Sequence, residues 1–430
     1  MDWILCCLAA FGLVSLYLSL QPRNVKRKAI PWSVFGVSLL TTELAWLWLP
    51  LQILLSLLLV AGGALDSVIG KLSLLVLLLS WCGLAWHIWQ SRAAAEVLED
   101  ALCEGLGKHY RERLDARRVA QLRQQVGFAD WKLPFRMTRP GVEVIRDIPY
   151  GPLGMRQHLD IYRPQQRRGN CPVLLQIHGG AWTMSRKEDQ GQPLMWHLAA
   201  RGWICVAVNY RLSPSVGFPT HLEDCKRALC WIRENGADYG MDTDFIAVTG
   251  GSAGGHLAAL VALTANRPEL QADNPQTDTA VQAAVPLYGI YDFVSRFQQY
   301  RYPEPLKKFL IGRVMYEDES ANPELWDLAS PVTLVNAEAP PFFVLHGTQD
   351  SLIPVRDAQL FVEKLRAVSQ QAVVYAELPY AEHGFELFHS QRAELTVDAI
   401  HRFLEWSYAK HLQQSPGVAG EELAQATGGG

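Results

Sequence analysis

The motif G-G-S-A-G-G, residues 250–255, connects an apolar run at residues 245–249 to a run of small and apolar residues, 257–263, that favours a helix. A sharp turn from strand to helix strains the backbone at its centre, and glycines two positions to either side remove the Cβ atoms that would collide there. Such a turn holds the Ser252 hydroxyl over the end of a sheet, with the amide of Ala253 beside it. We therefore predict that Ser252 is a nucleophile. The alternative is a glycine-rich turn whose serine has no catalytic role. The rest of the sequence must decide between these two interpretations.

Short β-rich runs alternate with helical segments after about residue 130. Strands are predicted at residues 158–162, 173–177, 204–209, 245–249, 281–288, 342–346 and 373–378, and the clearest helices at 221–235, 256–266, 355–369 and 391–411. This alternation predicts an α/β fold, with a mostly parallel sheet that is covered by helices on both faces. In such sheets the chemistry gathers at the carboxyl ends of the strands.

An acid and a histidine follow the last two predicted strands. Asp350 lies in the loop after residues 342–346, and His383 lies in the loop after residues 373–378. A serine hydroxyl is a poor nucleophile unless a base takes its proton, and the base needs an acid that fixes its tautomer. We predict Ser252, His383 and Asp350 as nucleophile, base and acid. Asp292, which follows the preceding strand, is an alternative acid.

The motif H-G-G-A-W, residues 178–182, directly follows the predicted strand 173–177. Its glycines let the main chain bend so that backbone amides face one point, where they can stabilise the oxyanion formed by attack on a carbonyl. His178 would support this loop, and we expect His256 and His346 to be structural. The predicted oxyanion donors are the amides of Gly179, Gly180, Ala181 and Ala253.

Together these motifs resemble the hormone-sensitive-lipase-like group of α/β-hydrolases. The resemblance covers residues 151–411 and includes N-Y-R-L-S-P at 209–214, G-T-Q-D at 347–350 and E-H-G-F at 382–385. With its apolar N-terminus, the chain is also similar to mycobacterial membrane-associated Lip-type esterases. It departs from the group's pattern at Gly251, where an aspartate is usual, and at Ala181-Trp182, where glycine is usual.

The resemblance implies an α/β-hydrolase fold with a helical lid, built from about residues 91–130 and from an insertion at about 293–339. The insertion is rich in aromatic side chains, which either line an acyl pocket or form the lid's own core: Phe297, Tyr300, Tyr302, Phe309, Tyr316 and Trp326.

The expected function is hydrolysis of small-molecule or lipid carboxylic esters, as an esterase or lipase, through an acyl-enzyme. An acyltransferase or an amidase or deacetylase could use the same triad, and a non-catalytic binding protein is less favoured because no triad residue is missing. No cofactor is expected. The eight cysteines form no C-x-x-C pair, so no metal site is predicted.

Membrane-length apolar segments fill the first ninety residues. Residues 3–20 and 72–90 carry no charge, and a third crossing is predicted at about 43–65 with an interfacial lead-in from residue 31. The basic loop at residues 23–28 predicts a multi-pass protein of the cell membrane, with its catalytic domain on the cytoplasmic side.

The rest of the chain divides into a helical linker or lid at 91–129, the catalytic domain at 130–411 and a disordered tail at 412–430. One face of the linker carries Leu98, Leu102, Leu106, Tyr110 and Leu114, four residues apart. With 39 basic and 43 acidic side chains, the chain carries no charge pattern for nucleic acid. The sequence does not determine the oligomeric state.

Overall fold

The computed structural model describes residues 1–20, 32–114, 116–166, 169–271, 273–294 and 304–414. The predicted basic loop at residues 23–28 therefore lies outside the described part of the chain, as do residues 415–430 of the predicted tail. Residues 412–414, which we assigned to that tail, continue the last helix instead.

An eight-stranded sheet with the order β1-β2-β4-β3-β5-β6-β7-β8 forms the centre of the molecule. β2 pairs antiparallel with β1 and with β4, and all other neighbours are parallel, which confirms the predicted mostly parallel sheet. The strands are β1 (Val142–Pro149), β2 (His158–Pro164), β3 (Cys171–Ile177), β4 (Ile204–Val208), β5 (Met241–Gly251), β6 (Ala283–Leu287), β7 (Phe342–Gly347) and β8 (Val373–Leu378).

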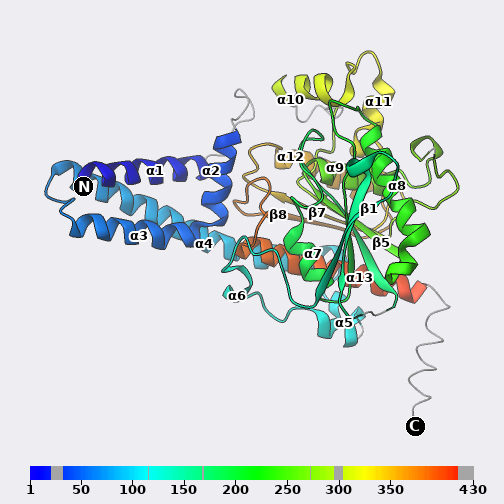
Figure 1. The fold of residues 1–430 in the computed structure, drawn as a ribbon, viewed down its shortest axis with the longest axis horizontal. Coiled ribbons are helices and arrows are strands. Elements are labelled where there is room, and N and C mark those ends of the chain that lie inside the picture. The colour runs from blue at the N-terminus through cyan, green and yellow to red at the C-terminus, as the bar shows by residue number, and fades with distance from the viewer. Residues whose placement is uncertain (21–31, 115, 167–168, 272, 295–303, 415–430) are drawn as a thin grey trace, which may run out of the picture.

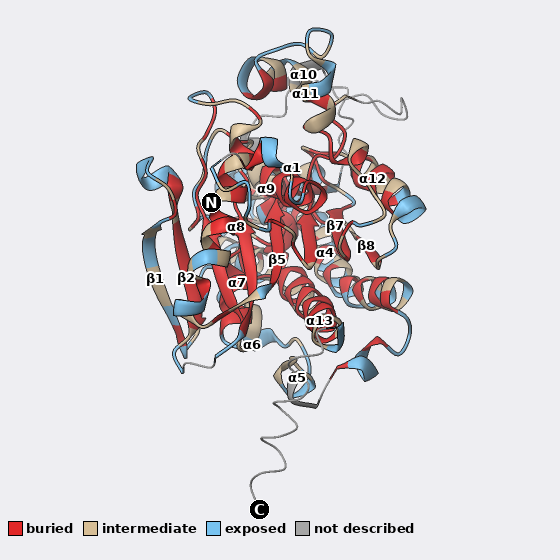
Figure 2. Ribbon diagram, turned by 90° about the vertical axis from the view of Figure 1, so that its right-hand side faces the viewer, coloured by how far each residue is buried: buried red, intermediate tan, exposed pale blue. Residues whose placement is uncertain are grey.

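Helices cover both faces of this sheet because alternate residues of its buried strands point to opposite sides. One apolar core contains Val173 and Leu175 of β3 with α8 (Thr220–Asn235), α9 (Ala253–Leu263) and α12 (Val355–Val368). The other contains Leu174 with α4 (Val68–Leu106), α7 (Gln192–Ala199) and α13 (Gln391–Gln414). Figure 2 shows the buried central strands between these layers and the partly exposed edge strand β1.

Shorter helical segments lie in the connections. They are η1 (Tyr110–Arg113), α5 (Ala116–Gln121), α6 (Phe128–Trp131), η2 (Gly154–Gln157), η3 (Gly236–Tyr239), η4 (Pro268–Leu270), α10 (Glu304–Phe309), η5 (Leu310–Met315), α11 (Pro323–Leu328) and η6 (Pro331–Thr333).

Long apolar helices from the N-terminal part of the chain project from one side of the sheet domain (Figure 1). α1 (Asp2–Leu20) and α4 are long and apolar enough to cross a membrane. A third candidate is the pair of α2 (Trp32–Glu43) and α3 (Ala45–Ala61), in which residues 35–43 meet α3 at 88°. This bend places α2, which covers residues of the predicted lead-in, across the base of the other helices (Figure 1).

The helix α4 is continuous across residue 90, where the sequence predicted a boundary between anchor and linker. Its second half packs under the sheet, with Leu98, Leu102 and Leu106 buried against β8 and α13. This half is therefore part of the sheet domain's core. The earlier apolar half leads out to the projecting helices.

The insertion between β6 and β7 forms a small cap of α10, η5 and α11 above the body of the domain (Figure 1). Trp326 is fully buried and packs edge-to-face on Phe293, with ring centroids 6.3 Å apart. Tyr316 is half-exposed and donates a hydrogen bond to the carbonyl of Pro214 at 2.8 Å. The predicted insertion aromatics Phe297, Tyr300 and Tyr302 lie outside the described residues.

Candidate active site

Ser252 occupies a strained turn between β5 and α9. Its backbone has φ 58° and ψ −123°, a conformation that a non-glycine residue adopts only when its surroundings impose it. A Cβ on Gly250 would lie 2.5 Å from the carbonyl oxygen of Ile177, and one on Gly254 would lie 2.8 Å from the carbonyl oxygen of His178. Both glycines are therefore required by the close approach of β3, as the motif predicted.

Asp350 and His383 meet at the carboxyl ends of β7 and β8. The Nδ1 atom of His383 lies 2.7 Å from Oδ2 of Asp350, and both side chains are buried. Because an ionised carboxylate can only accept, Nδ1 carries the hydrogen in this bond. The other oxygen of Asp350 accepts from the amides of Leu352 at 2.9 Å and Ile353 at 2.7 Å, which fix the carboxylate in its loop.

These contacts shift both pKa values toward the charged forms. Burial alone would raise the pKa of Asp350, but interactions with His383 and His346 lower it well below its ordinary value. Burial alone would lower the pKa of His383, but the Asp350 carboxylate raises it above the ordinary 6.5. His346 contributes directly, since its Nε2 lies 3.2 Å from Oδ2 of Asp350. The predicted structural histidine thus supports the acid.

Tyr288 links the Ser252 turn to the His383 loop. Its ring centroid lies 4.5 Å from that of His383. Its Cζ atom would lie 2.8 Å from a Cβ on Gly251, the residue directly before Ser252. No hydrogen bond joins Ser252 to His383 among the described residues, but Tyr288 adjoins both His383 and Gly251, the residue before Ser252.

The alternative acid, Asp292, accepts a hydrogen bond from the amide of Val294 at 3.2 Å. Asp350 is the acid that the structure pairs with His383.

The loop after β3 bends as its glycines allow. Gly180, Ala181 and Trp182 all have positive φ, at 100°, 51° and 59°. The amides of Gly180 and Ala181 donate no hydrogen bond to any other described residue. The amide of Gly179, which we also predicted as an oxyanion donor, instead donates to Oε1 of Gln190 at 2.5 Å.

Two histidines near the turn have structural contacts. His178 stacks on Tyr210 at 4.4 Å, and its Nδ1 lies 2.7 Å from the carbonyl oxygen of Gly179. Burial lowers the pKa of His178 to about 4, so the ring is neutral and supports the loop. His256 is fully buried, with Nε2 2.8 Å from the carbonyl oxygen of Ala329.

A buried network behind the turn involves side chains that sequence reasoning missed. Nε2 of Gln190 donates to the Tyr288 hydroxyl at 2.9 Å and to Oε1 of Glu386 at 3.2 Å. The Tyr288 hydroxyl in turn donates to Glu386. Because Oε1 of Gln190 also accepts from Gly179, the network ties the His383 loop to the loop after β3. Gly251 was the sequence signal for this network, because a glycine at that position leaves room for the side chains that form it.

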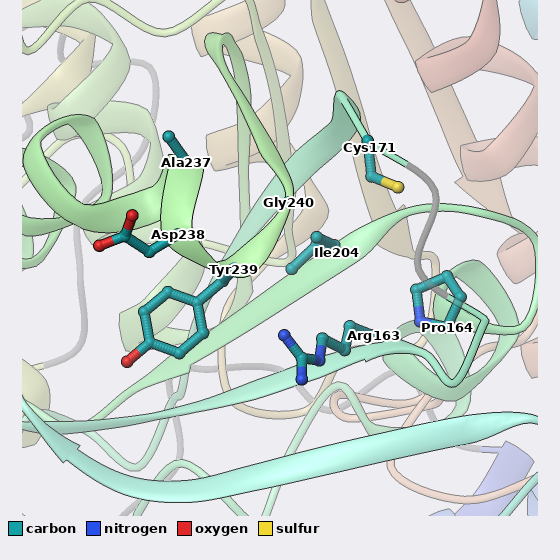
Figure 3. A pocket seen from close by; sticks show the side chains of 9 residues that line it. Arg163, Pro164, Cys171, Ile204, Ala237, Asp238, Tyr239 and Gly240 are labelled. Carbon is teal, nitrogen blue, oxygen red and sulfur yellow. The ribbon is translucent and has the colours of Figure 1, made fainter.

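A surface cavity of about 200 Å³ lies far from these residues (Figure 3). It opens beside Cys171 and Ile204, the first residues of β3 and β4, and is lined further by Arg163 and Tyr239. These are the amino ends of the parallel strands, whereas Ser252 and His383 lie at the carboxyl ends. The cavity is therefore not the candidate active site.

One carboxylate cluster in the described part of the chain has the spacing of a metal site, formed by Asp147, Asp160 and Glu188. The ammonium of Lys187 fills it, with Nζ 2.7 Å from Asp147, 3.2 Å from Asp160 and 2.5 Å from Glu188. The three carboxylates therefore already have their counter-charge.

Comparison with known proteins places the chain among ester hydrolases. The family model BD-FAE matches residues 159–365. The probable carboxylic ester hydrolase LipM of Mycobacterium tuberculosis is 52% identical over 276 residues, which are 64% of each chain, just under two thirds of LipM. From the same organism, esterase LipQ is 41% identical over 75% of this chain and 77% of its own. Esterase LipC is 38% identical over 76% of this chain and 85% of its own.

Solved structures give the same fold. A bifunctional GH43-CE protein of Bacteroides eggerthii has a TM-score of 0.55 at 27% identity, over 61% of this chain and 35% of that one. Inhibited esterase B from Lactobacillus rhamnosis has a TM-score of 0.55 at 21% identity, over 73% of this chain and 98% of that one, a likeness of fold alone.

Proposed function

Because this chain belongs to the Lip-type carboxylesterases of the α/β-hydrolase fold, we propose that it hydrolyses carboxylic esters with Ser252 as nucleophile, His383 as base and Asp350 as orienting acid. One observation carries the assignment. The hydrogen bond between His383 and Asp350 lies at the strand ends beside the strained turn that carries Ser252.

In the acylation step, Nε2 of His383 takes the proton from Ser252 as Oγ attacks the ester carbonyl carbon. The carbonyl π electrons move to its oxygen, which becomes an oxyanion. The amides of Gly180, Ala181 and Ala253 are the donors available to it, and each such donor contributes about 3 to 4 kcal/mol to the transition state. The oxyanion then collapses, the C–O bond to the alcohol breaks, and His383 returns its proton to the leaving alcohol.

Water completes the cycle by the same route. His383 takes a proton from water as its oxygen adds to the acyl carbon. The tetrahedral intermediate then collapses, the bond from the acyl carbon to Oγ of Ser252 breaks, and His383 gives its proton to Oγ, which releases the carboxylic acid and regenerates the Ser252 hydroxyl. Asp350 keeps Nδ1 protonated and stabilises the imidazolium that forms in both steps.

We further propose that α1, α3 and the first half of α4 anchor the enzyme in the cell membrane, with the catalytic domain on the cytoplasmic side. Their length and apolarity support the anchor. The basic residues between α1 and α2 support the sidedness, because positive loops are retained in the cytoplasm.

A pre-steady-state experiment tests the triad. Full-length protein in detergent is mixed with p-nitrophenyl butyrate, and we expect a burst of one p-nitrophenol per active site, the signature of an acyl-enzyme. Ser252→Ala should abolish burst and turnover, whereas Ser320→Ala, a variant of an exposed serine in the cap, should keep both. Retained turnover in Ser252→Ala would refute the assignment.

A further inference from the structure

The direction of α4 fixes which edge of the sheet lies next to the projecting helices. Trp86 packs edge-to-face on Tyr380, just beyond the carboxyl end of β8, with ring centroids 4.3 Å apart. Nineteen residues later along α4, a Cβ on Gly105 would lie 3.0 Å from Cα of Val374, at the amino end of β8. The helix thus runs antiparallel to β8. Its apolar half leaves the domain at the carboxyl edge, which also carries Ser252 and His383.

The helix α2 packs directly against the His383 loop. The Phe35 ring lies 6.1 Å from the His383 ring, in an edge-on arrangement. Leu39, Leu44 and Phe388 form one buried apolar cluster.

A buried ion pair fixes the junction of α2 and α3 to α13. Glu43 pairs with Arg392, and both side chains are fully buried. Glu43 also accepts a hydrogen bond from Ser390 at 2.7 Å. The projecting helices and the loop that carries the base are therefore one packed unit.

Large apolar side chains remain exposed beside this junction, between residues 128 and 136. Phe128 is 56% exposed, Leu133 50% and Phe135 66%. The exposed basic residues Lys132 and Arg136 alternate with them. Aromatic and apolar side chains interleaved with lysine and arginine are typical of segments that lie in the interface of a membrane with anionic lipid.

Contacts place this segment next to the projecting helices. Phe128 packs edge-to-face on Trp46 of α3, with ring centroids 5.5 Å apart. Phe135 packs on Phe388, five residues after His383, at 5.6 Å. In Figure 1, α6 and α2 both lie on the side of the domain from which the long helices project. We call residues 128–136 the collar.

We propose that the collar and α2 form a bilayer-facing surface around the mouth of the active site, so that the enzyme takes ester lipids directly from the membrane. The proposal rests on the triad and the anchor proposed above. The spanning helices bring the carboxyl edge of the sheet to the headgroups, the collar's apolar side chains enter the acyl boundary, and Lys132 and Arg136 pair with anionic headgroups. A substrate ester then reaches Ser252 without passing through water.

The test uses the full-length enzyme in vesicles of phosphatidylcholine and phosphatidylglycerol. Two substrates are compared: 4-methylumbelliferyl palmitate, which dissolves in the bilayer, and p-nitrophenyl acetate, which dissolves in water. The variant Leu133→Ser/Phe135→Ser removes two exposed apolar side chains. The control Val368→Ser removes one that is 44% exposed at the end of α12 that approaches the amino edge of the sheet.

We expect kcat/KM for the palmitate ester to fall about tenfold in the double variant, as loss of about 1.4 kcal/mol of membrane contact would give. The acetate ester should be hydrolysed at the wild-type rate, and the control should change neither. A second variant, Lys132→Gln/Arg136→Gln, should lose any stimulation of palmitate hydrolysis by phosphatidylglycerol.

Equal losses of kcat/KM for both substrates in the double variant Leu133→Ser/Phe135→Ser, or no loss for either, would overturn the proposal of a bilayer-facing surface. Failure of the triad proposal looks different, because the wild-type enzyme would then leave the acetate ester intact or Ser252→Ala would still cleave it.

Discussion

Replacing Gly251 by alanine should disable the enzyme because the new methyl group would displace the side chains of Gln190 and Tyr288. The added Cβ would lie 2.5 Å from Nε2 of Gln190 and 2.8 Å from Cζ of Tyr288. Carbon atoms in contact are normally about 3.5–4.0 Å apart, so these side chains must move by about 1 Å. Overpacking of this kind costs about 1–3 kcal/mol of folding free energy.

The loss of activity should exceed that stability cost. Gln190 holds the amide of Gly179, so its displacement frees the loop that presents Gly180 and Ala181. Losing the alignment of one oxyanion donor lowers kcat by about 10²- to 10³-fold. We therefore expect Gly251→Ala to lower kcat about 100-fold with little change in KM, because the oxyanion exists only in the transition state.

Steady-state kinetics and thermal unfolding of full-length Gly251→Ala, Gln190→Ala and the double variant measure both effects. Gly312→Ala is the matched control, since a Cβ there meets nothing within 4 Å. If both changes act through one network, their effects on kcat are non-additive and the double variant is little worse than Gln190→Ala. Wild-type kcat in Gly251→Ala, or simple additivity, would refute this reasoning.

Further predictions concern the acid, the buried ion pair and metal ions. In the wild type, kcat/KM should rise with pH through an ionisation above 6.5, because protonated His383 cannot accept the Ser252 proton. In Asp350→Asn the loss of the carboxylate lowers the His383 pKa, so the rise in the pH–rate profile should move to lower pH, and kcat should fall about 10⁴-fold. A rise at the wild-type pH would contradict the pairing of Asp350 with His383. Arg392→Met leaves Glu43 buried without its cation and should lower the free energy of unfolding by about 3–5 kcal/mol, whereas adding Glu43→Gln should recover part of it in the same unfolding assay. Dialysis against EDTA should leave esterase activity unchanged, since Lys187 already neutralises the carboxylate cluster of Asp147, Asp160 and Glu188; reversible loss of activity would contradict this.

Much of the fold could be predicted from the apolar runs and glycine motifs of the sequence. Within the buried strands β3, β5 and β7, residues 173–175, 245–248 and 342–345 are continuous apolar runs because both faces of these strands are covered by helices. The comparisons confirm the resemblance to Lip-type esterases that these motifs indicated.

Elements without a clear apolar pattern were missed. β1 is an edge strand whose side chains include Glu143, Arg146 and Asp147, so it has no apolar run. α7 has only eight residues, too few to show a helical period. The change at residue 90 from apolar to charged side chains predicted a boundary, yet helix-favouring residues such as Ala93, Ala94 and Ala95 continue α4 through it.

Side-chain contacts made in the folded protein could not be predicted from the sequence. Gln190 and Glu386 are 196 positions apart, and only the folded sheet brings them to one tyrosine. His346 was expected to be structural, but its contact with Asp350 depends on how the loop after β7 turns back on the strand. Gly179 belongs to the predicted oxyanion motif, yet its amide donates a hydrogen bond to Gln190, eleven residues further along the chain.

The site of covalent labelling tests the central proposal most directly. A fluorophosphonate probe is reacted with the full-length protein in membranes, and the modified peptide is identified by mass spectrometry. The proposed triad requires the label on Ser252, no label in Ser252→Ala and a much slower reaction in His383→Ala. A label on another serine, or an unchanged labelling rate without His383, would contradict it.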